Sequence, residues 1–114
     1  MELGGIHHVS AITANAEKNY DFFTRILGMR LVKKSVNQDN TSSYHLFYAD
    51  AVGTPGTDMT YFDIPRAART VPGASSISNT AFRVKSEAAL SYWKERFTQH
   101  QVHFEDVVER FGRK

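Results

Sequence analysis

Residues 20–36, YDFFTRILGMRLVKKSV, decide the expected fold because they join the end of a helix to the start of a strand. Apolar residues recur in the first part at three- and four-residue spacing, as in an amphipathic helix: Tyr20, Phe23, Ile26 and Leu27. Asn15 can cap the beginning of this helix, and Gly28 stands where a left-handed residue commonly ends one. The sequence therefore predicts a helix over 15–27 and a strand over 29–36.

Further strand-like runs lie on both sides of this stretch. Residues 6–12, IHHVSAI, are short and rich in β-branched residues, and two more apolar runs cover 43–49 and 57–64. A polar loop, NQDNTSS, and a turn, GTPG, separate the later runs, as expected between neighbouring strands. One strand, one helix and three strands make a βαβββ unit, so the sequence predicts an α+β fold.

The second half of the chain looks like the beginning of a second copy. An offset of 71 residues places Asn15 on Ser86 and Phe22 on Trp93, and strands are expected over 77–84 and 102–108 around this second helix. We expect paired βαβββ modules with the second incomplete: a first module at 1–65, a linker at 66–75 and a truncated strand-helix-strand module at 76–114. An unfinished sheet leaves an open edge, which predicts a homodimer paired through that sheet.

The composition is that of a globular chain large enough for one hydrophobic core. Apolar residues make up 41% and charged residues 23%, with a net charge of +2, and the basic residues are dispersed, which disfavours a nucleic-acid-binding surface. No apolar run approaches the length that crosses a bilayer, and the first residues lack a signal-peptide pattern. The absence of cysteine leaves His, Asp and Glu as metal ligands and suits a cytoplasmic protein.

Motif order over nearly the whole chain carries a family resemblance. The segments GIHHVSAIT, LGMRLVKKSVN, YHLFYAD and PGTDMTYF, in that order, resemble the ring-cleaving dioxygenases of the glyoxalase, bleomycin-resistance and extradiol-dioxygenase (vicinal oxygen chelate) superfamily, most closely the hydroquinone-type subgroup. The resemblance implies modules whose sheets curve around a cavity holding a divalent metal. Such proteins normally have four modules, so this chain is expected to be the N-terminal part of one.

His8 is the first candidate metal ligand. Alternation along a strand puts His8 on one face and Val9 with Ala11 on the other. The helix needs an apolar strand face against it, which Val9 and Ala11 provide, so His8 is expected to face the cavity. The position also matches the histidine that the superfamily carries on its first strand. The alternative is a histidine that only hydrogen-bonds in a polar pocket, and for His7 an exposed edge position is expected.

Asp58 is the second candidate metal ligand. Residues 58–61, DMTY, resemble the setting in which glyoxalase I-like members place a metal-binding glutamate. Aspartate has a shorter reach, and ring-cleaving relatives often have an apolar residue there, so a cross-strand polar contact is the alternative. The offset of 71 sets Asn79 opposite His8, and an amide is a poor ligand beside imidazole, which disfavours a complete glyoxalase I site within these residues.

Other histidines are less informative. His45 alternates with Tyr44, Leu46 and Tyr48, and the pattern leaves open which set lines the cavity. His100 and His103 are expected to be solvated at the end of the second helix. Neither a phosphate-binding glycine loop nor a nucleophile elbow is present in the sequence, which disfavours nucleotide chemistry and triad hydrolysis.

The expected function is therefore part of a metal-dependent, ring-cleaving dioxygenase acting on small catechol- or hydroquinone-like aromatics. The resemblance implies Fe(II), with Mn(II) as the other candidate, held by His8, a second histidine and a carboxylate. The 114 residues by themselves are expected to be inactive. Two alternatives stay open: a metal-free binding module of the bleomycin-resistance type, and a glyoxalase I-like isomerase.

Overall fold

The computed structural model describes residues 2–36, 43–69, 71, 73–77, 79–110 and 112. The chain divides into two compact units, Met1–Thr70 and Val71–Lys114, and the boundary lies within the segment 66–75 that the sequence predicts as a linker. Most of the predicted polar loop NQDNTSS lies outside the described residues.

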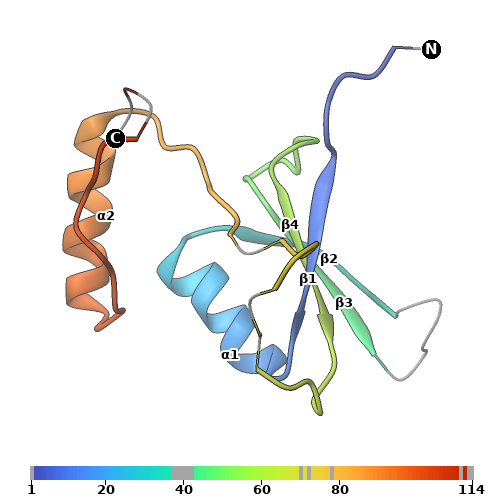
Figure 1. The fold of residues 1–114 in the computed structure, drawn as a ribbon. Coiled ribbons are helices and arrows are strands. Elements are labelled where there is room, and N and C mark those ends of the chain that lie inside the picture. The colour runs from blue at the N-terminus through green and yellow to red at the C-terminus, as the bar shows by residue number, and fades with distance from the viewer. Residues whose placement is uncertain are drawn as a thin grey trace. The chain divides into compact units, whose positions relative to one another are not determined.

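The first unit is one βαβββ module (Figure 1). Its elements in chain order are β1 (His8–Thr13), α1 (Ala16–Asp21), η1 (Phe22–Ile26), β2 (Arg30–Val36), β3 (Tyr44–Ala49) and β4 (Asp58–Asp63). The four strands form one sheet in the order β1-β4-β3-β2. β1 and β4 are parallel, while β4 with β3 and β3 with β2 are antiparallel. This arrangement confirms the predicted α+β class.

The helical segment begins and ends at the residues that the sequence indicates. The Asn15 side chain accepts a hydrogen bond of 3.0 Å from the backbone N–H of Lys18 and so caps α1. The last part, η1, has the wider hydrogen bonding of a π-helix, in which the N–H of Leu27 donates to the carbonyl of Phe22 at 3.0 Å. Gly28 has a φ of +71°, a conformation that a residue with a Cβ adopts only at a cost.

The core lies between this helical segment and one face of the sheet. Its buried members come from the helix and from β3 and β4: Phe23, Leu46, Tyr48 and Met59. Val9 and Ala11 of β1 pack against them, as expected from the alternation along that strand. The face of the sheet that points away from the helix is therefore free to carry polar side chains.

The second unit contains the helix α2 (Glu87–Gln99). The Ser86 hydroxyl accepts a hydrogen bond of 3.3 Å from the N–H of Ala89, which confirms the predicted cap. The described residues of 77–84 and 102–108 form no strand, so that prediction is wrong for them. A strand is held by hydrogen bonds to a neighbouring strand, and the described residues of this unit offer only an isolated bridge at Arg110.

Helix α2 is less covered than its apolar spacing suggests. It has no buried residue, and Tyr92 is 55% exposed, so the aromatic residues of this helix form no buried core. In the part of the chain that the structure describes, neither α2 nor any other helix has the length and apolar character to pass through a membrane.

Candidate functional site on the polar face of the sheet

The side of the sheet opposite the helix carries a continuous set of polar and aromatic side chains, which we call the polar face. Strand register places its members side by side on all four strands: His8, Ser10 and Ile12 of β1, Asp58, Thr60 and Phe62 of β4, His45 and Phe47 of β3, and Lys33 and Ser35 of β2. Both residues predicted as ligands lie on this face. Leu46 and Tyr48 belong to the core, so the choice that the sequence left open is decided and His45 lies on the polar face.

His8 is an exposed residue at the start of β1. Its ring centroid lies 6.1 Å from that of Phe47 in an edge-on arrangement, and its Nδ1 lies 3.0 Å from Nδ1 of His7. Because Val9 and Ala11 pack into the core, His8 lies on the side of the sheet away from the helix, and that it faces a cavity stays a prediction. The imidazole is accessible and held by ring contacts, as a ligand for a metal or a substrate must be.

Asp58 is the direct neighbour of His8 across β1 and β4. Its side chain is 8% exposed, and its Oδ2 lies 3.9 Å from Nδ1 of His7. Its Oδ1 is buried and has no hydrogen-bond partner. A buried carboxylate oxygen without a partner is costly and calls for an explanation such as a bound cation.

These two side chains fit a divalent metal in part. Imidazole and carboxylate are suitable ligands for Fe(II) and Mn(II), and a bound cation would give the unpartnered oxygen of Asp58 a partner. Within the described ranges, however, no group of three His, Asp or Glu side chains comes together that could hold a metal ion. His8 and Asp58 can therefore supply two ligands, and any third ligand has to come from outside the described residues.

A chain of three hydrogen-bonded side chains crosses the polar face. The hydroxyls of Ser10 and Thr60 lie 2.6 Å apart, and Nε2 of His45 lies 3.0 Å from Thr60 Oγ1. Thr60 is fully buried, so its hydroxyl depends on these two partners. Sequence reasoning missed this network, although the apolar character of Leu46 and Tyr48 could have assigned His45 to the opposite face.

The environment of His45 favours the neutral form of its imidazole. Burial lowers its pKa below the ordinary value of 6.5, and the charges of His8 and Lys33 lower the pKa further. An imidazole with a lowered pKa in the folded state binds protons more readily when the chain unfolds. The stability that follows from this difference is present above pH 6.5 and is lost as the pH falls through the lower, folded-state pKa.

We therefore expect the variant His45→Gln to lose less stability than the wild-type protein on acidification. The measurement is the urea midpoint of unfolding at a series of pH values below 6.5 and at neutral pH. Glutamine keeps a hydrogen-bonding group beside Thr60 but does not titrate, so it isolates the ionisation. Parallel pH profiles for the two proteins would show that His45 does not contribute.

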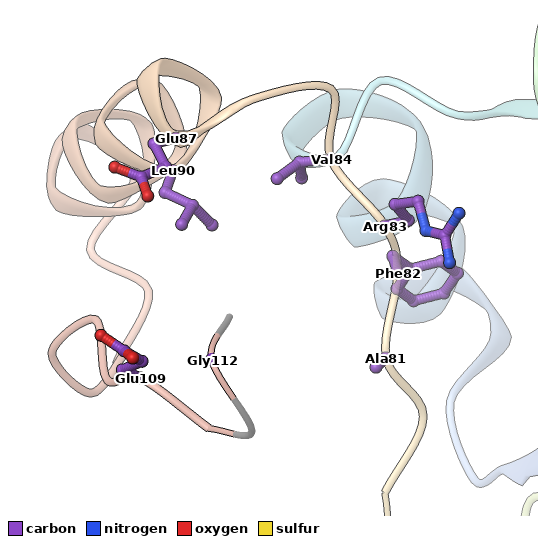
Figure 2. A pocket seen from close by; sticks show the side chains of 8 residues that line it. All are labelled: Ala81, Phe82, Arg83, Val84, Glu87, Leu90, Glu109 and Gly112. Carbon is purple, nitrogen blue, oxygen red and sulfur yellow. The ribbon is translucent and has the colours of Figure 1, made fainter. Parts of the chain in front are cut away.

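A separate hollow lies within the second unit and holds none of the candidate ligands. Figure 2 shows its lining: Ala81, Phe82, Arg83, Val84, Glu87, Leu90, Glu109 and Gly112. Leu90 points toward the hollow, and the guanidinium of Arg83 turns away from it (Figure 2). Since its charged groups do not converge, we assign it no chemistry.

Comparison with known proteins gives the family. The sequence model of the Glyoxalase/Bleomycin resistance protein/Dioxygenase superfamily matches residues 5–114. The chain belongs to this superfamily. Among its members, "Putative ring-cleaving dioxygenase MhqA" of Bacillus subtilis is 54% identical over 113 residues, which are 99% of this chain and 36% of that protein. The "Chlorohydroquinone/hydroquinone 1,2-dioxygenase" of Sphingobium indicum is 36% identical over 112 residues, 96% of this chain and 35% of that protein.

Solved structures show the superfamily fold as well. A crystal structure titled as that of a "putative dioxygenase" from Bacillus subtilis has a TM-score of 0.86 and 37% identity, with 95% of this chain and 34% of that chain covered. The fosfomycin resistance protein FosX from Listeria monocytogenes has a TM-score of 0.65 at 19% identity, covering 98% of this chain and 81% of its own, and supports the fold alone. The chain spans about a third of the length of the curated relatives that it matches.

Proposed function

We propose that this chain forms part of a ring-cleaving dioxygenase that acts on small catechol- or hydroquinone-like aromatics with a divalent metal, Fe(II) first and Mn(II) second. The observation that carries the proposal is the pairing of His8 with Asp58 on the polar face, in a chain 54% identical to a protein named as a ring-cleaving dioxygenase. The predicted homodimer and the predicted cytoplasmic location stay predictions.

Each residue has a distinct part in this proposal. His8 Nε2 or Nδ1 and a carboxylate oxygen of Asp58 would hold the metal, which when bound supplies a site where a dihydroxylated ring and dioxygen meet. The edge-on contact of Phe47 restricts the orientation of the His8 ring. Thr60 is buried and hydrogen-bonded to both Ser10 and His45, so it would hold these two side chains in place on the polar face. In this proposal the chain supplies metal ligands and side chains held in fixed positions on a partly buried face of the sheet.

The second candidate is a metal-free binding module of the bleomycin-resistance type. It is favoured by the absence of a three-ligand cluster among the side chains that the structure describes, and by the aromatic rings that lie on the same face as His8. A glyoxalase I-like isomerase is favoured less, because Asn79 occupies the position that the offset of 71 sets opposite His8. Metal dependence of ligand binding separates the first two candidates.

We expect the 114-residue chain to bind Mn(II) weakly through His8. The measurement is the free Mn(II) signal in electron paramagnetic resonance during a titration of the protein. His8→Ala is expected to weaken binding by about tenfold or more because it removes one of two ligands. The matched control is His103→Ala, an exposed histidine of the second unit, which should leave binding unchanged. Equal affinities for all three proteins would remove the metal role from His8.

A chimera tests the ring-cleaving activity directly. The 112 matching residues of the Sphingobium indicum dioxygenase would be replaced by those of this chain. The rest of the dioxygenase then supplies the remaining residues of the site. After anaerobic Fe(II) loading, the chimera is expected to consume dioxygen in the presence of hydroquinone, and His8→Ala within it to abolish the uptake. A folded, iron-loaded chimera without hydroquinone-dependent uptake would contradict the proposed activity.

A further inference from the structure

One end of the polar face combines a cation with three aromatic rings, in which the ring of His45 contacts the other two. Lys33 of β2 lies beside Phe47 of β3, and Phe47 lies between β2 and Thr60 of β4. His45 and Phe62 are direct partners on β3 and β4. We call the four side chains Lys33, His45, Phe47 and Phe62 the cationic aromatic patch.

The rings of this patch hold each other in place. The centroid of His45 lies 4.1 Å from that of Phe62 at an interplanar angle of 24°, and 4.1 Å from that of Phe47 at 39°. Nε2 of His45 is fixed by Thr60 at 3.0 Å. A prearranged aromatic surface binds a further ring at low entropic cost, since few side-chain rotations have to be frozen.

The charge of this patch is positive, and within the ranges that the structure describes no carboxylate pairs with it. The Lys33 ammonium lies over the Phe47 ring, with its Nζ 5.4 Å from the ring centroid, and forms no ion pair with any carboxylate of the described residues. The carboxylate of the polar face, Asp58, lies near His7 and not near Lys33, with its Oδ2 3.9 Å from Nδ1 of His7. Burial is the main cause of the lowered pKa of His45, and the charges of His8 and Lys33 lower that pKa further.

We propose that the cationic aromatic patch binds an aromatic ring that carries an anionic oxygen, either a carboxylate or a phenolate. The ring packs against Phe47 and Phe62, and the anionic oxygen accepts a hydrogen bond from the ammonium of Lys33. This inference rests on the proposed function, since it names the class of aromatic that the polar face selects, but the binding itself requires no metal.

Lys34 provides a matched control on the same strand. It pairs with Leu46, a core residue, and therefore lies on the opposite side of the sheet from Lys33. Its Nζ lies 4.2 Å from the ring centroid of Tyr44, so it too is a lysine over an aromatic ring. The two lysines differ in face and not in residue type, strand or local chemistry.

The test is a titration of the metal-free 114-residue chain with benzoate, with 4-nitrophenolate and with the neutral analogue benzamide, followed by backbone amide shifts of β3 and β4 in nuclear magnetic resonance. Benzoate or 4-nitrophenolate is expected to bind with saturable shifts, and Lys33→Met to weaken that binding by about tenfold. Lys34→Met should leave it unchanged. Benzamide should bind more weakly than benzoate and respond little to Lys33→Met.

Three results would overturn the inference. These are equal affinities for benzoate and benzamide in the wild-type chain, equal effects of Lys33→Met and Lys34→Met, and the absence of saturable shifts with either anion. Failure of the proposed dioxygenase function can be told apart from failure of this inference. In the first case metal binding or dioxygen uptake is absent, while benzoate still binds and Lys33→Met still weakens that binding. Binding of one anion but not the other decides between carboxylate and phenolate and supports the patch in either case.

Discussion

Replacing Tyr48 with alanine is expected to lower the free energy of unfolding by about 3–5 kcal/mol. Tyr48 is fully buried, and its ring stacks on Phe23 with centroids 4.8 Å apart. Its hydroxyl donates a hydrogen bond of 2.8 Å to Asn19 Oδ1, and burial raises its pKa to about 12. Alanine would remove the ring that joins β3 to the helical segment and leave a cavity.

The measurement is urea unfolding of the first unit, monitored by backbone amide signals that belong to β3 and β4. Tyr44→Ala is the control, because Tyr44 lies on the same strand and is 45% exposed; its effect should stay within about 0.5 kcal/mol. Tyr48→Phe separates the hydroxyl from the ring and should cost about 1 kcal/mol. Similar losses for Tyr44→Ala and Tyr48→Ala would show that the core does not depend on this ring.

Replacing Asp58 with valine is expected to raise the free energy of unfolding by about 1–3 kcal/mol, and at the same time to weaken Mn(II) binding. The physical reason is the buried Oδ1, which has no hydrogen-bond partner, in a side chain that is 8% exposed. Removing a buried, unpartnered carboxylate oxygen removes a desolvation cost. A residue that costs stability and binds a cation is typical of a functional site.

The control for this prediction is Asp63→Val on the same strand. Asp63 lies at the end of β4 and, by alternation, on the other side of the sheet from Asp58, so its replacement should change neither Mn(II) affinity nor, beyond about 0.5 kcal/mol, the stability. Both quantities are measured on each variant by urea unfolding and by the Mn(II) titration. A loss of stability in Asp58→Val would mean that the carboxylate supports the fold and is not held there for a ligand.

Both predictions follow from the two sides of one sheet. The side toward the helix is apolar and carries the stability, with Tyr48 at its centre. The other side holds His8, Asp58 and the Ser10–Thr60–His45 network. A protein of this kind can vary the polar side without losing its fold, which is why the same module serves different chemistries in one superfamily.

Local sequence determined the elements of the first unit. The spacing of apolar residues, the cap at Asn15 and the glycine at position 28 depend on neighbours within a few residues, and all three are present where expected. The direction of His8 also followed from the sequence, because Val9 and Ala11 are the side chains of β1 that suit a core. Alternation with a period of two then leaves one choice for the histidine.

Tertiary structure decided what depends on pairing between distant residues. The register of β1 with β4 brings Asp58 beside His8, and the register of β3 with β4 brings His45 to Thr60; neither contact can be computed from spacing, because a shift of one residue moves a side chain to the other face. The same physics explains why the described residues of 77–84 and 102–108 form no strand, although the sequence predicts one in each range. Their sequence suits a strand, but a strand forms only where another strand accepts its hydrogen bonds.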